Sequence, residues 1–415
     1  MGLKFLHTAD IHLGKTYRSG GAEMTRYEDF FTMLGKIVEV AVTDKVDFVL
    51  IAGDLFHTGQ ILPKTFARTI EVLQPLMDAC IPCIAVEGNH DWIHRRDSIS
   101  WMEALSQMGY LHLLRPSRTE TDGYRFDPFD WVEGHGGHIE IKGVNIYGLG
   151  YIGSQAGNHV ARICEAVTTK NNILLFHVGI WSYSPVEIGN MKPEEALPLS
   201  KVFEYIALGH GHKAYTLETS EGRSYAYNPG SPECVNFGEE KFVKGYYLVT
   251  IDGSSYRSEF HQTSPRPMLV MNINVDGSEN VADAVIRLKE QIGIKMAGFD
   301  DVRQPLLEVK LTGRIGFHPF ELGRESLRIA ITEHCTPLHI EIKNHLSLIT
   351  RQSGAEKEMK NLFEIERDVL RGLISSRSEY KGREDELVRL SIAIRDQVMK
   401  GDCDGEELLD ILGEL

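Results

Sequence analysis

The chain has 415 residues, of which 42% are hydrophobic and 25% charged, so it resembles an ordinary globular protein with a large domain and one or two smaller units. Its formal net charge of -15 argues against a protein that binds polyanions over its whole surface. If the protein binds nucleic acid, it must therefore do so through a local basic patch, bound metal or a second subunit. We find no signal peptide and no stretch apolar enough to span a bilayer, which predicts a cytoplasmic protein.

Six cysteines are too few for a disulfide framework in a chain of this length. Cys80 and Cys83 form a C-x-x-C pair at the start of an apolar run, with no second pair elsewhere. Buried packing is therefore favoured over zinc binding or redox chemistry.

Five short apolar runs alternate with helical patterns, which indicates an α/β fold with buried strands. These strands are expected at residues 4–8, 48–52, 82–86, 172–176 and 205–208. Helices are expected at residues 24–43, 64–79 and 98–108, an irregular stretch at 113–140, a hairpin at 139–147, and further strands at 225–227, 246–251 and 256–262.

Composition changes at Thr263-Ser264-Pro265-Arg266-Pro267, which is typical of a linker between domains. We therefore expect a first domain at residues 1–262 and a small α+β unit at 268–345. The strands of this unit are expected at 268–275, 306–312 and 338–343, and its helices at 281–292 and 319–332. A last segment at 354–415 is expected to be helical.

Each of the five buried strands is followed by residues that can bind a metal ion. In chain order these are Asp10 and His12, Asp54, Asn89 with His90, His177, and His210 with His212. A single such histidine is usually an ordinary loop or core residue, but loops at one sheet edge can converge on one site. Two divalent ions about 3.5 to 4 Å apart would activate water for in-line attack on phosphorus, with Asp54 as the natural bridge. The mixed oxygen and imidazole donors favour Mn, Fe, Zn or Co over Mg or Ca.

The series Asp10-x-His12, Gly53-Asp54-x-x-His57, Gly88-Asn89-His90-Asp91, His177 and Gly209-His210-x-His212 resembles the calcineurin-like metallophosphoesterase superfamily. Within it, residues 8–14, 53–57 and 228–233 are similar to the SbcD branch, whose members are nuclease subunits of DNA double-strand-break repair complexes. The resemblance implies a four-layer α/β fold, a β-sandwich flanked by helices, with a small α+β capping domain and a helical C-terminal tail.

The resemblance also implies roles for individual residues. It assigns one metal to Asp10, His12, Asp54 and His212, and the other to Asp54, Asn89, His177 and His210. His90 would face the scissile phosphate, where it stabilises charge or protonates the leaving oxygen, and Asp91 would orient its imidazole. The alternative for Asp91 is a structural cap on the following turn. His57 would help to position the substrate.

Several residues beside the site motifs suit a DNA substrate. A cationic track is formed by Lys15, Arg18, Arg95, Arg96 and Lys213, although a solvated surface explains any one of them equally well. Tyr17 and Trp92 are able to stack on a base or sugar, and packing is the alternative for both.

The helices expected at residues 64–79 and 98–108 each carry a stripe of apolar side chains. Such stripes ordinarily pack onto the sheet. The resemblance instead implies that these stripes form a four-helix bundle between two chains, which gives a homodimer. The two stripes contain Phe66, Ile70, Leu73 and Leu76 or Met77, and Ile99, Met102, Leu105 and Met108. Two further stripes contain Leu362, Ile365, Val369, Leu370 and Leu373, and Leu387, Leu390, Ile394 and Val398. These either grip the coiled coil of an SbcC-type ABC ATPase or fold back on the capping domain.

The sequence thus predicts a Mn-dependent DNA nuclease, associated with the nucleoid, that acts with such an ATPase. The branch implies 3′ to 5′ exonuclease activity on duplex ends and endonuclease activity on single strands. The alternatives are a small-substrate phosphodiesterase or phosphatase with the same site, and a mainly architectural subunit. The ATPase is expected on another chain, because this one has no Gly-x-x-x-x-Gly-Lys phosphate loop.

Overall fold

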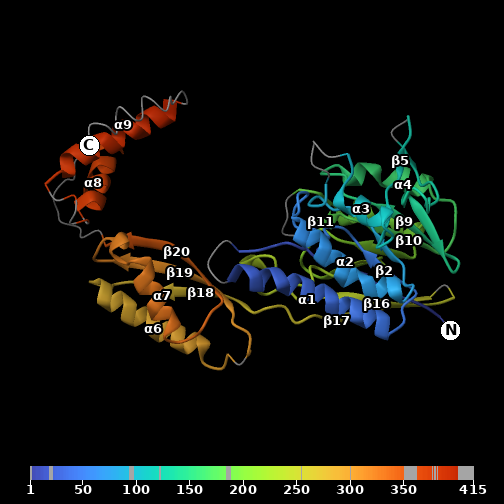
Figure 1. Ribbon diagram of the computed structural model, residues 1–415, viewed down its shortest axis with the longest axis horizontal. Coiled ribbons are helices and arrows are strands. Elements are labelled where there is room, and N and C mark those ends of the chain that lie inside the picture. Colours follow the sequence, from blue (N-terminus) through green and yellow to red (C-terminus); the bar gives the residue numbers. More distant parts are fainter. Residues whose placement is uncertain are drawn as a thin grey trace. The chain divides into compact units, whose positions relative to one another are not determined.

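The computed structural model describes residues 2–17, 22–92, 98–120, 123–183, 188–253, 255–299, 301–349, 362–375, 377, 380 and 382–400. The chain divides into two compact units, Met1–Ile349 and Thr350–Leu415. Figure 1 shows the helices and strands of both. Within the described ranges, no helix is both long enough and apolar enough to cross a membrane.

Two β-sheets form the centre of the first unit (Figure 1). The first has the order β17-β16-β1-β2-β3-β4-β7 and the second the order β14-β15-β13-β10-β9-β8. The strands of the first sheet are β1 (Leu3–Thr8), β2 (Phe48–Ile51), β3 (Cys83–Ala85), β4 (His112–Leu114), β7 (His135–Gly136), β16 (Gly245–Asp252) and β17 (Ser255–Gln262). Those of the second are β8 (His138–Ile141), β9 (Val144–Leu149), β10 (Asn172–Phe176), β13 (Tyr205–Leu208), β14 (Tyr215–Glu218) and β15 (Ser224–Asn228).

Strand β2 shows why the two sheets lie face to face. Successive side chains of a strand point to opposite faces, and all four residues of β2 are buried. Val49 and Ile51 pack in the core beneath the helices, whereas Phe48 and Leu50 pack in the core between the sheets. The apolar run without polar alternation therefore indicates a strand covered on both sides, as the sequence predicted.

Helices cover the outer faces of the sheets and complete four layers, which confirms the predicted α/β class. The first sheet is covered by α1 (Ala22–Thr43), α2 (Pro63–Asp78) and α3 (Trp101–Gln107). The second is covered by η1 (Ala156–His159), α4 (Val160–Glu165), α5 (Pro193–Ala196) and η2 (Leu197–Lys201). Short pairs β5 (Ser117–Arg118) with β6 (Tyr124–Arg125), and β11 (Gly179–Ile180) with β12 (Asn190–Met191), and the turn η3 (Phe237–Glu239) lie in the connections.

Residues 268–349 form a small α+β region around a parallel sheet of order β18-β19-β20. Its elements are β18 (Met268–Asn274), α6 (Val281–Met296), β19 (Leu306–Ile315), η4 (Pro319–Glu321), α7 (Arg324–Thr332) and β20 (His339–Leu348). The single helix expected at 319–332 is wrong, because Leu322 leaves helical geometry and α7 starts anew after Gly323. In the second unit, α8 (Leu362–Ser375) packs with α9 (Glu384–Lys400), and ion pairs join Glu366 to Arg395 and Arg371 to Asp385.

Two smaller expectations need correction. Helix α3 begins at Trp101 rather than residue 98, because the Ser100 side chain caps it by accepting a hydrogen bond from the backbone N–H of Glu103 at 3.0 Å. Cys83 is buried as expected, but Cys80 is exposed. Only one member of the C-x-x-C pair therefore serves as core packing.

The imidazole of His7 on β1 bridges the two sheets. Its Nε2–H donates to the carbonyl of Leu208 and its Nδ1 accepts from the Tyr205 hydroxyl, both at 3.0 Å. The side chain is fully buried, and burial lowers its pKa to about 3. Because Leu208 is the last residue of β13, this bridge fixes the strand end that leads into His210.

Replacing His7 by Leu is expected to destabilise the fold by about 1–3 kcal/mol near pH 7.5, since two buried polar groups lose their partner. In the unfolded chain His7 takes up a proton below pH 6.5, but in the folded chain only near pH 3, so its contribution declines as pH falls through this window. His7→Leu should therefore show a shallower loss of melting temperature with acid than the native chain. Exposed His345→Gln is the control, and an unchanged pH slope in His7→Leu would contradict the assignment.

Candidate metal centre

The loops after five parallel strands converge at one edge of the sandwich. β1, β2 and β3 run parallel in the first sheet, as do β10 and β13 in the second. The two sheets are joined at this edge by His210, whose backbone N–H donates to Asp10 Oδ1 at 2.9 Å. The structure therefore brings together all seven residues that the sequence nominated as ligands, namely Asp10, His12, Asp54, Asn89, His177, His210 and His212.

Four of these residues have left-handed backbone, which L-residues rarely adopt. The φ angles are 52° at Asp10, 54° at His12, 51° at Asp54 and 75° at His210. Two hydrogen bonds between loops hold the first three, from Asp10 N to Gly53 O at 3.1 Å and from His12 N to Asp54 O at 3.0 Å. Such backbone costs about 1–3 kcal/mol per residue and clusters at functional sites.

The two carboxylates each keep one oxygen for the site. Asp10 Oδ2 is buried and has no hydrogen-bond partner. Asp54 Oδ1 accepts from His90 N at 2.9 Å, while Oδ2 lies 3.5 Å from His177 Nε2 and 3.9 Å from His12 Nε2. Burial raises the pKa of Asp10 to about 6, against the opposing charges of His177 and His212. A buried carboxylate oxygen without a partner is the arrangement that a bound cation would satisfy.

The histidine rings are fixed from outside so that one nitrogen of each faces inward. His177 Nδ1–H donates to Ala52 O, His210 Nε2–H to Ile188 O and His212 Nδ1–H to Glu239 Oε1, each at 2.7 Å. The inward nitrogens of His177 and His210 lie 3.2 and 2.9 Å from Asn89 Oδ1. His212 Nε2 faces His12 Nε2 at 3.0 Å.

These donors fit two divalent ions. One cluster contains Asp10, His12 and His212, and another contains Asp10, Asp54 and His177, with the ligand atoms of each within 4.8 Å of one another. His12 Nε2 and His212 Nε2 are close enough for one cation to bind both, and the outer hydrogen bonds of His177, His210 and His212 fix the tautomers that metal binding requires. Asp10 belongs to both clusters, and the bridging role of Asp54 stays a prediction.

Asp91 corrects one expectation. Its carboxylate accepts from the backbone N–H groups of Leu55, Phe56 and Gly88 at 3.2, 2.8 and 2.9 Å, so it ties two site loops together. The predicted contact with the His90 imidazole is therefore wrong, because the carboxylate is already occupied by backbone donors. His90 is oriented instead by its Nδ1–H, which donates to the carbonyl of His57 at 2.7 Å. The rings of His12, His57 and His90 form a third cluster, which leaves the role of His90 a prediction.

The expected cationic track is only partly described. Lys15 is half-buried beside the site, where burial and the charge of Arg26 lower its pKa, and Lys213 is exposed. Arg18, Arg95 and Arg96 lie outside the described residues.

The two aromatic candidates differ. Tyr17 packs: its hydroxyl donates to Val235 O at 3.3 Å, and its ring lies 5.5 Å from that of His339. Trp92 is 52% exposed, with its ring 5.4 Å from Tyr151.

Three residues near the site were missed from the sequence. Asn228 donates from its side-chain amide to Gly211 O and Lys213 O at 2.5 and 2.8 Å, and so shapes the loop of His212. The ring of Tyr151 lies 5.4 Å from that of His210. Glu239 binds His212, as described above. The motif at 228–233 marked this loop, but nothing in the sequence pairs Glu239 with a residue 27 positions away.

Comparison with known proteins identifies the family. Residues 3–214 match the family model described as calcineurin-like phosphoesterase. The chain belongs to this family. The match includes every predicted metal ligand and confirms the superfamily and the metal-dependent phosphoesterase chemistry expected from the sequence.

Among relatives of this phosphoesterase chain, the DNA double-strand break repair protein Mre11 of Saccharolobus solfataricus is 26% identical over 296 residues, covering 70% of each chain. Mre11 of Archaeoglobus fulgidus is 29% identical over 313 residues, covering 71% of this chain and 68% of that one. Among solved structures, a dimetal phosphatase from Danio rerio has a TM-score of 0.40 and 11% identity, covering 63% of this chain and 96% of that one.

Gly88→Ala is expected to disrupt the centre without unfolding the chain. A Cβ at this position would lie 2.0 Å from Asp54 Oδ1 and 2.5 Å from Asp54 N, so Asp54 must move. We expect divalent metal to bind about 10- to 100-fold more weakly in a calorimetric titration. Gly35→Ala, in α1 with no atom within 4 Å of the new Cβ, is the matched control and should stabilise slightly. If Gly88→Ala binds divalent metal with native affinity, the close packing of Gly88 does not position the Asp54 side chain.

Proposed function

We propose that this chain is a two-metal DNA nuclease of double-strand-break repair. The observation that carries the proposal is the convergence of four imidazoles, two carboxylates and an amide at one edge of the sandwich, where Asp10 Oδ2 is buried without a hydrogen-bond partner. The similarity to Mre11 proteins over about two thirds of their length supports DNA as the substrate. Mn is our choice among Mn, Fe, Zn and Co, the ions that the mixed donors favour.

His90 is the residue we assign to proton transfer. Bound divalent ions supply Lewis-acid activation of water and of the phosphodiester. Because His90 Nδ1–H donates to the His57 carbonyl, we assign the proton transfer to its Nε2. In the protonated form this nitrogen donates to the oxygen that leaves phosphorus as the P–O bond breaks. His57 and Lys15, with Arg18 and Arg95, would hold the DNA backbone.

The remaining parts of the chain suit handling of DNA ends. We assign residues 268–345 as the capping domain beside a nuclease domain at 1–262, and residues 354–415 as the segment that binds an SbcC-type ABC ATPase. Val369 and Leu373 of α8 are 41% and 38% exposed in their own unit, which supports an apolar contact for this helix pair. Such a complex would act on duplex ends as a 3′ to 5′ exonuclease and on single strands as an endonuclease.

The decisive experiment is cleavage of end-labelled duplex DNA by the purified chain with and without Mn. Removal of metal by chelator should abolish cleavage. His90→Gln should lower the rate about 100-fold or more, since a proton donor is lost, and leave the measured metal stoichiometry unchanged. A small phosphodiester is the comparison substrate. Cleavage of that substrate alone, even with a cognate ATPase present, would replace the DNA assignment by a small-substrate phosphodiesterase.

A homodimer is the expected solution state. Leu73 and Leu76 of α2 are buried, whereas Met77 is 46% exposed; on the second stripe Met108 is 49% exposed. These outward ends of the stripes support an apolar contact between two copies. Met77→Glu with Met108→Glu should convert a dimer to a monomer in analytical ultracentrifugation. The control is Met24→Glu, on a methionine of α1 that is 55% exposed, and a dimer that survives the double substitution would refute this interface.

A further inference from the structure

We propose that Glu239 is a positioning residue of the metal centre, holding the imidazole of His212 so that its Nε2 stays directed at the ion it shares with His12. The inference rests on the proposed assignment of His212 as a ligand. Glu239 lies outside residues 3–214, which the family model matches, so the inference adds a residue from beyond the matched region.

The contact between the two side chains is direct. His212 Nδ1–H donates to Glu239 Oε1 at 2.7 Å, and both groups are largely buried, with side chains 16% and 3% exposed. The bond fixes both the ring rotation and the tautomer of His212. A carboxylate on the outer nitrogen also makes the inner nitrogen a stronger donor to metal.

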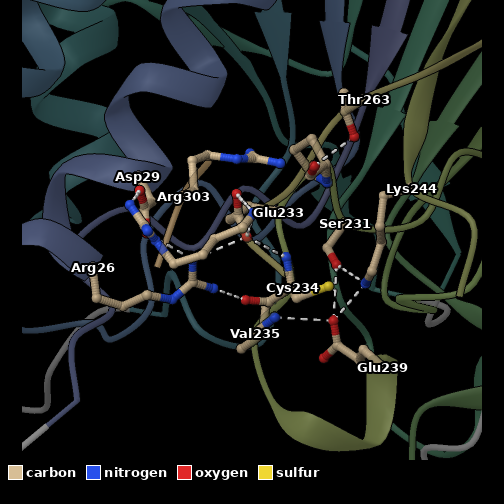
Figure 2. A network of polar contacts seen from close by, with 12 residues as sticks. Arg26, Asp29, Ser231, Glu233, Cys234, Val235, Glu239, Lys244, Thr263 and Arg303 are labelled. Carbon is tan, nitrogen blue, oxygen red and sulfur yellow. Dashed lines mark hydrogen bonds and ion pairs between the residues drawn. The ribbon is translucent and has the colours of Figure 1, made fainter. Parts of the chain in front are cut away.

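Glu239 is itself bound at both carboxylate oxygens, and Figure 2 shows its contacts with Ser231, Val235 and Lys244. Its Oε2 accepts from Ser231 Oγ at 3.2 Å and Val235 N at 3.0 Å, and pairs with the Lys244 ammonium, which is 1% exposed. Asn236 Nδ2 donates to Oε1 at 2.7 Å. Burial alone would raise the pKa of Glu239, but the hydrogen bond from His212 and the charge of Lys244 lower it to about 2.

Lys244 connects this carboxylate to the ligand residue by a second route. Its ammonium donates to the backbone carbonyl of His212 at 3.1 Å as well as to Ser231 Oγ at 2.6 Å. Glu239 therefore binds the ring of His212, and Lys244 binds its backbone carbonyl. Loss of Glu239 would also leave the Lys244 charge buried without a carboxylate and close to the cation site, which opposes metal binding.

The loop that carries these contacts is anchored to distant parts of the chain (Figure 2). Arg26 of α1, fully buried, donates to Glu233 Oε1 at 2.9 Å and to the carbonyl of Cys234. The backbone N–H of Arg266 donates to the same carboxylate at 3.2 Å, and the Arg266 guanidinium binds Asp29 of α1 at 2.6 and 2.8 Å. These contacts tie the loop to α1 and to the linker, so Glu239 is supported where it binds His212.

Metal titration followed by Mn electron paramagnetic resonance tests the proposal. Glu239→Ala should weaken one of two bound ions about 10- to 100-fold and leave the other unchanged. Glu239→Gln, whose carbonyl still accepts from Nδ1–H, should recover part of that loss. Exposed Glu221→Gln is the matched control.

A second readout is the visible spectrum of the Co-substituted protein, which should change in Glu239→Ala and not in the control. Two ions bound with native affinity and an unaltered Co spectrum would overturn the proposal. Should Glu239→Ala fail to fold, Ser231→Ala provides the test, since it removes one support of the same carboxylate. These readouts need no DNA: a chain that fails to cut DNA but shows the expected metal losses refutes the nuclease and keeps the role of Glu239.

Discussion

The left-handed backbone at Asp10, His12, Asp54 and His210 is the constraint on which the metal centre depends. An extended backbone would continue each strand and point alternate side chains away from one another. The left-handed turn instead directs carboxylates and imidazoles back over the sheet edge. Its cost, about 1–3 kcal/mol at each residue, is offset by hydrogen bonds between the loops and by the three backbone N–H groups that Asp91 binds.

The centre is also shared between two sheets, so neither sheet can form it alone. Asp10, His12, Asp54 and Asn89 follow strands of the first sheet, whereas the remaining histidines follow strands of the second. Contacts between the sheets therefore matter to the chemistry. The His7 bridge to Leu208 and the apolar core around Phe5 and Leu175 set the distance across which the two groups of ligands meet.

The sequence alone predicted where this centre lies, because a buried strand can be recognised from a short continuous run of apolar residues. Val49 to Ile51 is an apolar run that Gly53 and Asp54 terminate, and the same pattern recurs at the other strands. Interactions between residues far apart in the chain were not visible in this way. Asp91 was assigned to its sequence neighbour His90, but besides nearby Gly88 it binds Leu55 and Phe56, which the parallel pairing of β2 and β3 brings near.

Tyr17 and the broken helix at 319–332 illustrate the same limit. The position of Tyr17 next to a motif suggested a stacking surface, but it packs against His339, more than 300 residues away in the chain. The apolar residues over 319–332 keep helical spacing, but the backbone leaves helical geometry at Leu322 and Gly323, which separates η4 from α7. Periodicity reports which residues are buried, whereas the end of a helix depends on backbone geometry at one residue.

The electrostatics of the chain explain how an acidic protein is suited to a phosphodiester. With a net charge of -15, the surface as a whole repels a polyanion, so attraction must be concentrated where the scissile bond lies. The buried carboxylates Asp10 and Asp54 provide local negative charge, which two bound divalent cations would neutralise and exceed. Lys244 pairs with Glu239 behind His212, so Glu239 would not offset the charge of ions bound at the site. Under the proposed two-metal function, bound ions would therefore give this acidic site its attraction for phosphate.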